Sequence, residues 1–329
     1  MNGARGLHPD QPLRVAAIGG GTGLAALLRA LQPEAGRARD PWRLTGIVAV
    51  SDNGGSSGRL REELGGIPPG DLRNCLSAMT REDSLLADLL SYRFKGEGPL
   101  AGHALGNLML MALADLAGGW VRAIRQLSEV LAIEGRLFPS TLEPVALCAE
   151  DMEGRQYRGE TEVNVCHPPL ARLWLEPRDA EALAEALLAV MQADVVLLAP
   201  GSLYSSTLPN LLIPEFQRAL ARAQTPLIYV ANLMTEPHES AGLNLEAHVA
   251  SIQAFGGVGL AAVIANSEPL PEAMAERYRA EGGAPLLPLG EEVCGVPMKA
   301  VPLLDLEAPQ ARHDPGRLRE ALREVIAAL

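Results

Sequence analysis

The chain has 329 residues, of which 48% are hydrophobic and 21% are charged. These totals are typical of a globular protein with one large domain or two smaller ones. The net charge of −12 argues against a nucleic-acid partner, because nucleic acids bind best to a basic face. No run of about 18 apolar residues is present, so the sequence predicts no membrane span.

The N-terminal stretch MNGARGLHPDQP has no apolar segment of the kind found in signal peptides. We expect residues 1–12 to be a frayed lead-in to the first strand. The cysteines show neither a C-x-x-C pair nor the spacing of zinc ligands. Together these features predict a cytoplasmic protein whose thiols stay reduced.

Short apolar runs alternate with helical patterns along most of the chain. The predicted strands cover 13–19, 43–51, 194–201, 225–232 and 260–266. The predicted helices cover 22–33, 70–79, 83–94, 103–118, 121–133, 179–192, 209–223, 243–255, 272–283 and a last helix that begins at Asp314-Pro315. Between these elements, residues 140–176 combine strand-like content with turn residues and predict an antiparallel excursion.

This order of elements predicts an α/β fold with a doubly wound, mostly parallel, Rossmann-like sheet and helices on both faces. We expect residues 13–329 to form a single domain, into which 140–176 is inserted as a small antiparallel β excursion. In such sheets, ligands bind outside the carboxyl ends of the strands. The loops at those ends are therefore the candidate site.

A glycine-rich loop, GGGTGL, follows the first strand. Glycines there let the backbone approach a phosphate, and the next helix offers free N–H groups at its N-terminus. Residues 21–26 match G-x-G-x-x-A, which makes NAD one candidate ligand, although no acidic residue ends the second strand at the usual distance. A tight glycine turn without a ligand is the alternative. The candidate ligand-binding residues are Gly20, Gly21, Thr22 and Gly23.

The second loop, SDNGGSSGRLR, follows the second strand, and its GGSSG portion is predicted to be flexible. Its hydroxyls, free N–H groups and arginines suit an anion. The aspartate could hold a sugar hydroxyl, a base or Mg²⁺, so Asp52 is a candidate metal ligand. A surface loop in solvent is the alternative. The candidate residues are Asp52, Asn53, Gly55, Ser56, Ser57 and Arg59.

Two further motifs carry polar residues that could face the same cleft. PPGDLRNCL contributes Asp71, Arg73 and Asn74, although Asp71 could instead be a simple helix N-cap. GHALGN contributes His103 and Asn107, which are four residues apart and share one face of an otherwise apolar helix. A structural histidine with satisfied hydrogen bonds is the alternative for this motif.

The later strands end in similar polar loops. APGSLYSSTLPN supplies Gly201, Ser202, Ser205 and Ser206, and ANLMTEP supplies Asn232 and Thr235. Four strands thus end in small polar residues. This repetition predicts one long cleft lined by N–H groups and hydroxyls, suited to a nucleotide or a nucleotide-sugar.

These six motifs, in this order, resemble the gluconeogenesis factor family (YvcK-like) of the 2-phospho-L-lactate transferase (CofD-like) superfamily, over roughly residues 13–325. The resemblance implies a cytoplasmic bacterial protein needed for normal cell shape and for growth on gluconeogenic carbon sources, with links to UDP-sugar binding and peptidoglycan homeostasis. It also marks Tyr278 and Arg312 as family positions. Tyr278 could stack on a base and Arg312 could clamp a diphosphate. The alternatives are a helix-surface aromatic and an arginine paired near the final N-cap.

The transferase branch of that superfamily implies a different function, in which a lactyl-phosphate group moves from a guanosine diphosphate carrier to a deazaflavin with Mg²⁺. Asp52 and Asp71 match aspartates of that branch and are the candidate catalytic residues. The NGGSSG segment lacks the further acidic residue and the aromatics of that branch, and APGSLYSS also departs from it. Three hypotheses stay open: a UDP-sugar-binding regulator, a Mg²⁺-dependent transferase and an NAD-binding protein. The regulator is favoured, with a homodimer as a candidate assembly.

Overall fold

The computed structural model describes residues 11–37, 42–81, 84–166, 168–223 and 225–329. Of the lead-in predicted for residues 1–12, positions 1–10 lie outside the described residues. Within these ranges, no helix is both long and apolar enough to cross a bilayer.

An eight-stranded sheet forms the centre of the molecule, in the order β10-β11-β9-β8-β7-β1-β2-β3. Every neighbouring pair is parallel except β10 and β11. The inner strands are buried along almost their whole length, as expected for a parallel sheet covered on both faces. The strands are β1 (Arg14–Gly19), β2 (Arg43–Val48), β3 (Arg136–Pro139), β7 (Val195–Leu198), β8 (Leu227–Val230), β9 (Ala262–Asn266), β10 (Glu292–Val293) and β11 (Val296–Val301). The predicted fold class is confirmed.

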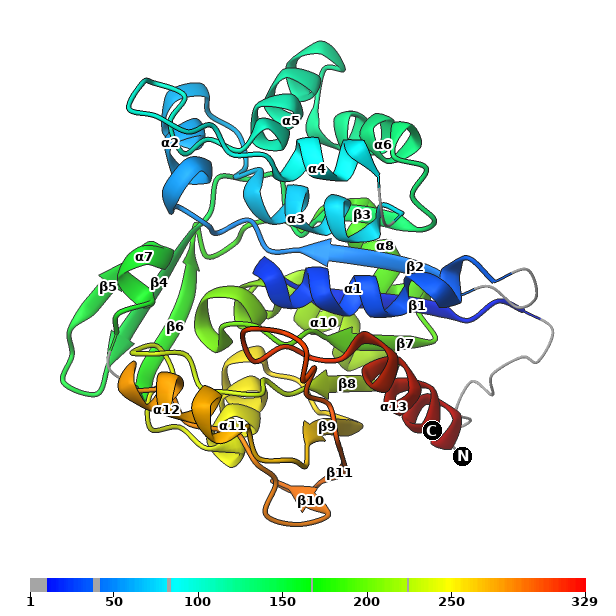
Figure 1. Cartoon of the computed structure of the whole chain (residues 1–329), viewed down its shortest axis with the longest axis vertical. Helices are drawn as coiled ribbons and strands as arrows, with labels where there is room; N and C mark the ends of the chain where they lie inside the picture. Colours follow the sequence, from blue (N-terminus) through cyan, green and yellow to red (C-terminus); the bar gives the residue numbers. More distant parts are fainter. Residues whose placement is uncertain (1–10, 38–41, 82–83, 167, 224) are drawn as a thin grey trace.

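Helices cover both faces of this sheet. In Figure 1, α1 and α13 lie on the face nearer the viewer, and α1 packs on both α3 and α13. The chain leaves β1 and β7 in opposite directions, so right-handed crossovers place α1, which follows β1, and α10, which follows β7, on opposite faces. The helices are α1 (Gly21–Ala35), α2 (Gly55–Leu64), α3 (Gly70–Met79), α4 (Leu85–Ser91), α5 (Leu105–Leu116), α6 (Trp120–Val130), α8 (Ala184–Gln192), α9 (Leu208–Leu211), α10 (Pro214–Ala223), α11 (Leu245–Gly256), α12 (Glu272–Ala280) and α13 (Pro315–Ala328).

The strand order reverses between β1 and β7. From β1 the chain continues outward to β2 and β3, whereas from β7 it continues to β8, β9 and β11. The two strands are paired directly, with Val15 opposite Val195 and Ile18 opposite Leu198. In open α/β sheets the loops leave a switch point on opposite sides, which makes it the expected position for a ligand.

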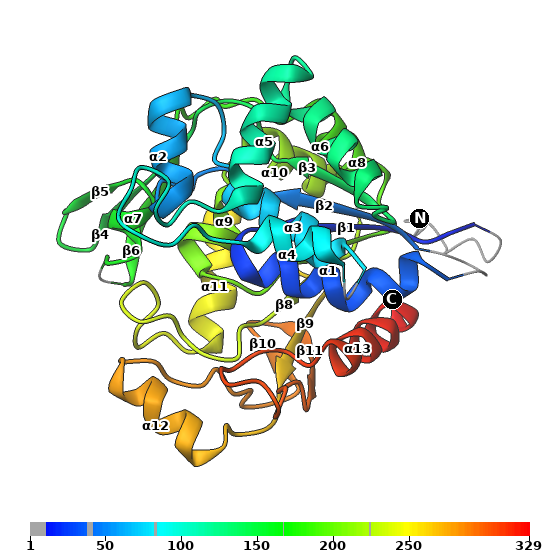
Figure 2. The ribbon, with the colours of Figure 1, turned by 45° about the horizontal axis from the view of Figure 1, so that its top comes forward.

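The predicted antiparallel excursion forms a separate three-stranded sheet in the order β5-β4-β6. Its elements are β4 (Ala146–Asp151), β5 (Gln156–Arg158), the short helix α7 (Glu160–Val163) and β6 (Leu170–Glu176). Figures 1 and 2 show this sheet beside the carboxyl ends of the parallel strands, with α7 next to it. The excursion therefore borders the edge at which a ligand is expected.

The structure corrects the sequence prediction in two places. The GGSSG segment, predicted as a flexible loop, is the first turn of helix α2, which begins at Gly55. Glycine and serine have low helix propensity, but this turn is stabilised by burial of Ser56, Ser57 and Leu60. Strands β3, β10 and β11 were not predicted, because their short sequences lack a clear apolar alternation.

Candidate functional site

The loops after β1 and β7 touch each other across the switch point. A Cβ atom added to Gly23 would lie 1.8 Å from the carbonyl oxygen of Pro200, and one added to Gly20 would lie 3.4 Å from the Cβ of Ser206. Asn210 ties the same two loops by donating from Nδ2 to the carbonyl of Gly19, at 3.1 Å. Gly23 therefore permits a close backbone contact that no residue with a side chain would allow, whereas Gly20 packs on Ser206 at an ordinary contact distance.

Asp71 occupies the N-terminus of α1. Its Oδ2 atom accepts a hydrogen bond from the backbone N–H of Gly21, at 2.7 Å. Burial, and then the nearby charge of Asp52, raise the pKa of this carboxyl to about 6, against the opposing effects of the Gly21 N–H and Arg73. The carboxylate of Asp71 therefore accepts a hydrogen bond from the N–H of Gly21, which the sequence analysis expected to bind a phosphate. Thr22 lies exposed in the same turn.

Asp52 lies between the two sheets. Its Oδ1 atom accepts from the N–H of Gly54 at 2.7 Å, and its carboxyl group faces that of Glu160 on α7. Burial, followed by the hydrogen bond to Asp52, raises the pKa of Glu160 to about 9. Two carboxyl groups in direct contact cannot both ionise at low cost, so this pair favours holding one proton between them. Sequence reasoning missed Glu160, because nothing local indicates that residue 160 folds against residue 52.

Asn53 anchors the excursion. Its Oδ1 atom accepts from the N–H of Thr161 at 3.0 Å, and its amide lies against Gly159. Asn53 is therefore part of the contact that holds α7 against the loop after β2. Its neighbour Gly55 has a φ of +50° and open space around it, so glycine serves backbone conformation there.

Among the described residues, no three His, Cys, Asp or Glu side chains are placed to hold a metal ion. Mg²⁺ is often bound by one or two carboxylates together with phosphate oxygens. Asp52 and Asp71 fit that smaller role, because each has one carboxylate oxygen held by a backbone N–H. Asp71 would offer its other oxygen to an ion that also binds a ligand phosphate, and Asp52 would do the same once its contact with Glu160 opens.

A buried network joins α3, α5 and α2. Arg73 donates from Nε to Oδ1 of Asn107 at 3.3 Å, Asn107 donates from Nδ2 to Oγ of Ser56 at 3.1 Å, and Ser56 lies 3.0 Å from Nδ1 of His103. All four residues are buried.

One donor fixes the direction of every hydrogen bond in this network. A guanidinium can only donate, so the Asn107 atom facing Arg73 is the oxygen and the amide NH₂ faces Ser56. Ser56 accepts that hydrogen, and Nδ1 of His103 is the acceptor within reach of its own hydrogen. The tautomer that fits this arrangement carries the ring proton on Nε2. His103 and Asn107 share one polar face, as predicted, and both side chains form hydrogen bonds with other residues of the protein.

The remaining candidates from the β2 half lie around this network. Arg59 is exposed and donates from Nη2 to the carbonyl of Ala101 at 2.9 Å. Ser57 packs so closely on Gly70 that an added Cβ would lie 2.2 Å from its Oγ, which fixes α2 against α3. Asn74 is partly buried on α3, and its side chain forms no hydrogen bond with the described residues.

Gly201 and Asn232 are locked together at the carboxyl ends of β7 and β8. Asn232 accepts from the N–H of Gly201 at 2.8 Å and donates to its carbonyl at 2.7 Å. Ser202 precedes a short π-helix, η1 (Leu203–Thr207), and its carbonyl accepts from the N–H groups of Ser206 and Thr207 at 3.0 Å. Ser206 is half-buried against Gly20 and Gly21.

A second internal carboxylate occupies the start of η1. Glu239 accepts from the N–H groups of Tyr204 and Ser205, at 2.6 and 2.7 Å. Burial raises the pKa of Glu239 to about 7, although the two N–H groups oppose this shift. The side chain of Ser205 is buried beside the same carboxylate. Sequence reasoning missed Glu239, whose contact partners lie about 35 positions earlier in the chain.

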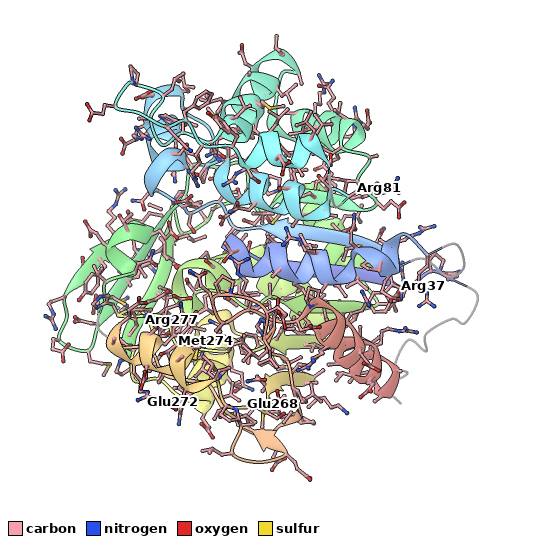
Figure 3. All side chains as sticks on the ribbon, viewed as in Figure 1. Arg37, Arg81, Glu268, Glu272, Met274 and Arg277 are labelled. Atoms are coloured by element: carbon pink, nitrogen blue, oxygen red, sulfur yellow. The ribbon has the colours of Figure 1, made fainter. Side chains whose placement is uncertain are left out.

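The C-terminal candidates lie beyond the end of β8. The N–H of Ala311 donates to the hydroxyl of Tyr278 at 3.1 Å, and Nε2 of His313 hydrogen-bonds to the carbonyl of Ala231 at 3.1 Å. These contacts hold the loop that carries Arg312, which is exposed and forms no ion pair with any described residue. Arg277, labelled in Figure 3, supports the same loop by donating to the carbonyl of Pro309 at 2.6 Å.

Thr235 is used structurally. Its Oγ1 accepts from the N–H of Ala284 at 2.9 Å, and its own N–H donates to the carbonyl of Ala284 at 2.8 Å. The threonine side chain therefore closes the loop after β8 against the segment that follows α12.

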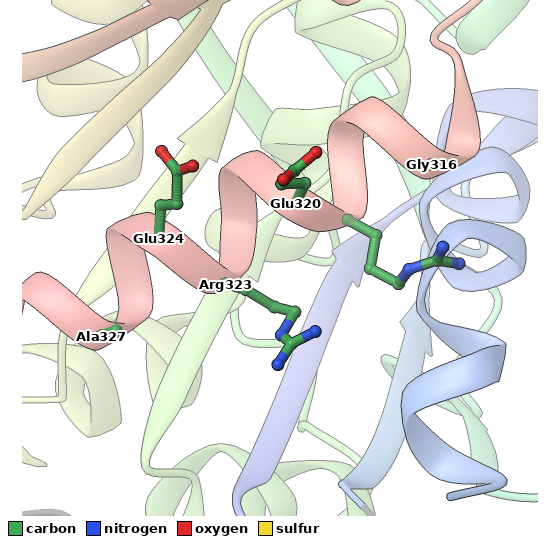
Figure 4. A pocket seen from close by; sticks show the side chains of 6 residues that line it. Gly316, Glu320, Arg323, Glu324 and Ala327 are labelled. Atoms are coloured by element: carbon green, nitrogen blue, oxygen red, sulfur yellow. The ribbon is translucent and has the colours of Figure 1, made fainter.

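A surface depression of about 500 Å³ runs along α13 (Figure 4). The residues that line it, including Gly316, Glu320 and Arg323, all belong to this one helix. Arg323 lies 4.0 Å from Glu34 in the last turn of α1, which places this region roughly 20 Å along the helix from Gly21. The depression is therefore separate from the carboxyl edge of the sheet.

The predicted residues thus form two groups at the carboxyl edge. One group surrounds the β2 half and includes Asp52, Ser56, Asp71, Arg73 and Asn107. The other surrounds the ends of β7 and β8 and includes Gly201, Asn232 and the loop that carries Arg312. The glycine loop after β1 lies between the two groups.

Known proteins resemble this chain over most of its length. The family model of 2-phospho-L-lactate transferase CofD matches residues 15–292. The gluconeogenesis factor of Bacillus subtilis is 37% identical over 277 residues, which cover 84% of this chain and 86% of that protein. The gluconeogenesis factor of Halalkalibacterium halodurans is 37% identical over 274 residues, covering 83% of each chain.

A solved structure agrees with these sequence matches. The crystal structure of a UPF0052 family member from Bacillus halodurans superposes with a TM-score of 0.87 at 34% identity, covering 95% of this chain and 99% of that one. The family resemblance stated from the motifs is therefore confirmed. The chain belongs to the CofD family and, within it, to the gluconeogenesis factors.

Proposed function

We propose that this protein is a cytoplasmic regulator that binds a UDP-sugar at the carboxyl edge of its sheet and does not turn it over. In this role it would support cell shape and cell-wall homeostasis during growth on gluconeogenic carbon sources. Membership of the gluconeogenesis factor family supports this role.

The observation that carries the proposal is the meeting of two glycine-containing loops at the switch point between β1 and β7. Two glycine loops meet there, and Asn232 fixes one of them in place. Arg312 is exposed next to this region on a loop that Tyr278 and His313 hold. The guanidinium of Arg312 forms no ion pair with a described residue, so it could bind the diphosphate of a ligand. Arginine binds phosphates in a bidentate manner.

The carboxylate of Asp71 at the start of α1 weighs against NAD binding. A dinucleotide of the usual kind places its pyrophosphate on the N–H groups at the start of α1. In this protein the N–H of Gly21 donates to Asp71. A bound pyrophosphate would have to displace that carboxylate or lie beside it.

Calorimetric titration with UDP-N-acetylglucosamine, GDP and NAD tests the proposal, with each ligand measured with and without Mg²⁺. We expect UDP-N-acetylglucosamine to bind without Mg²⁺ and to be recovered unchanged. The R312Q variant should bind about tenfold more weakly, since a charge-assisted hydrogen bond contributes about 1.5–3 kcal/mol. Tighter binding of NAD than of the other two ligands would contradict the proposal.

The carboxyl groups of Asp52 and Asp71 favour one second candidate, a Mg²⁺-dependent transferase acting on a nucleoside-diphosphate-linked substrate. Asp71 has one oxygen beside the one held by Gly21, and Asp52 would have one once its contact with Glu160 opens. A strict Mg²⁺ requirement with a preference for GDP would support the transferase. In that case D52N should abolish the Mg²⁺ dependence, whereas it should leave Mg²⁺-independent UDP-sugar binding largely intact.

A further inference from the structure

Helix α5 is apolar on its outer face as well as on its inner face. The inner face is buried through Gly106 and Leu110, and Gly106 lies against side chains of α3 and α4. The outer face carries a second apolar stripe, whose members recur at intervals of three and four residues: Leu105, Leu108, Ala112 and Leu116. Leu116 is 82% exposed. A helix that is hydrophobic all round is ordinarily buried on every side, so the outer stripe needs a partner.

The outer stripe lies at one end of the molecule. In Figures 1 and 2, α5 reaches the outer boundary of the ribbon, on the side of the central sheet where β2 and β3 lie. The helices that pack on α5 from within the chain include α3, α4 and α6. A second molecule could therefore reach the outer stripe without any rearrangement of the fold.

The two ends of α5 carry opposite charges that the protein does not pair. Asp115 is exposed in the last turn, where the helix dipole disfavours a negative charge. Beside the first turn, Arg59 donates to the carbonyl of Ala101 at 2.9 Å, and Arg93 donates to that of Gly102 at 3.0 Å. Within the described part of the chain, none of these three charged side chains forms an ion pair.

An antiparallel second copy of α5 complements the outer stripe. Two such helices are related by a twofold axis, so every contact between them is made twice. When the helices are centred on each other, Leu105 faces the partner subunit's Leu116, and Leu108 faces the partner subunit's Ala112. A large side chain thereby meets a small one, which suits packed helices whose axes lie about 8–10 Å apart.

The same pairing brings the opposite charges together. Asp115 lies about 15 Å along the helix from Leu105, so the partner subunit's Asp115 comes to the first turn of α5. Arg59 and Arg93 are at that end, and the helix dipole there favours a negative charge. We propose that α5 pairs antiparallel with α5 of a second copy of this chain, which makes the protein a homodimer. This inference does not depend on the proposed function.

The outer stripe forms the centre of this interface, and neighbouring side chains extend it. Tyr92 and Leu100 are both exposed beside the start of α5, where the N–H of Leu105 donates to the carbonyl of Tyr92 at 2.8 Å. A dimer of standard size buries about 800 Å² on each partner. An interface centred on one twelve-residue helix is smaller, so we expect a dimer that dissociates in the micromolar range.

Sedimentation velocity over a range of protein concentrations tests the assembly. We expect wild type to change from monomer to dimer as its concentration rises. L116E should raise the dimer dissociation constant about tenfold or more, because it places an unpaired charge in the apolar centre twice per dimer. A wild-type protein that stays monomeric at every concentration, or an L116E variant that dimerises as strongly as wild type, would overturn the proposal.

L289E is the matched control. Leu289 is 84% exposed and precedes β10, at the opposite end of the central sheet from β3. This variant places the same new charge on an exposed leucine outside the interface. We expect it to dimerise like wild type.

An exchange of charges tests the antiparallel pairing and separates it from folding. D115R and the double variant R59E/R93E each set like charges against one another at both ends of the helix pair, which is strongly unfavourable across an interface. We expect each variant to be monomeric alone and the two to form a mixed dimer when combined, since every charge then faces its opposite. Misfolded chains would not regain association on mixing. A mixture that stays monomeric would overturn the pairing.

Discussion

The side chain of Asn232 binds both polar groups of the Gly201 backbone, accepting from its N–H at 2.8 Å and donating to its carbonyl at 2.7 Å. A side-chain amide reproduces here the pairing that a neighbouring strand would give. The contact lies where β7 and β8 have ended, so it extends their pairing into the loops. It holds the loop after β7 in the conformation that meets the glycine loop after β1.

Replacing Asn232 by alanine should therefore destabilise the fold. Asn232 is only 6% exposed, so N232A leaves two backbone groups with poor access to water. We expect the free energy of unfolding to fall by about 2–4 kcal/mol. Chemical denaturation measures this change. N74A is the control, because Asn74 makes no side-chain hydrogen bond in the described structure, and its effect should stay within about 0.5 kcal/mol.

The contact between Gly23 and Pro200 gives a second stability prediction. An added methyl group would overlap the Pro200 carbonyl oxygen, which belongs to the backbone and cannot move alone. We expect G23A to lower the free energy of unfolding by about 2–4 kcal/mol, or to prevent folding. G98A is the matched control, since a Cβ at Gly98 meets no atom within 4 Å. Equal thermal midpoints for the two variants would show that the loops do not pack this closely.

Much of the fold and of the site could be predicted from local sequence. Buried parallel strands appear as continuous apolar runs, and their carboxyl ends meet at one edge, so the polar loops had to gather there. The loops at Gly20, Asp52, Gly201 and Asn232 are the clearest cases. Helix α2 could not be predicted in this way. Its serines are buried by contacts with other parts of the chain: Ser57 packs on Gly70 of α3, and Ser56 hydrogen-bonds with His103 and Asn107, which is a tertiary effect.

The partners of the polar groups could not be predicted from sequence at all. Asp71 lies 50 residues from Gly21, and Glu239 lies 35 residues from Tyr204. In each case a carboxylate binds the N–H groups at a helix start, where the sequence alone suggested a phosphate. Local patterns show which groups can bind an anion. They do not show whether the protein itself supplies that anion.

The carboxyl group of Glu239 predicts a pH dependence of stability. Its pKa is about 7 in the folded protein, compared with about 4.3 in an unfolded chain. Between these values the folded state binds more protons than the unfolded state, so the free energy of unfolding should decrease as the pH rises from about 4.5 to 7. Glutamine keeps the acceptor oxygen but does not titrate. E239Q should therefore reduce this decrease.

Chemical denaturation at pH 5 and at pH 8 measures the effect. We expect wild type to lose more stability than E239Q between the two conditions, by an amount of the order of 1–3 kcal/mol. Asp71 has a pKa of about 6 and acts in the same direction, but it is present in both proteins and cancels in the comparison. Identical pH profiles for the two proteins would show that Glu239 does not retain its proton on folding.

The hydrogen-bond directions around Asn107 make a prediction that does not depend on stability. In wild type, the Nε2–H tautomer of His103 should be observed by ¹⁵N NMR of the imidazole, because Ser56 donates to Nδ1. The N107D variant replaces the amide donor by a second carboxylate oxygen, so Ser56 must donate to residue 107 instead. His103 then has to donate from Nδ1 to Ser56, and the tautomer should invert. The N107Q variant keeps the amide group but moves it by one methylene, so it tests the placement of the amide. An unchanged tautomer of His103 in N107D would contradict the network.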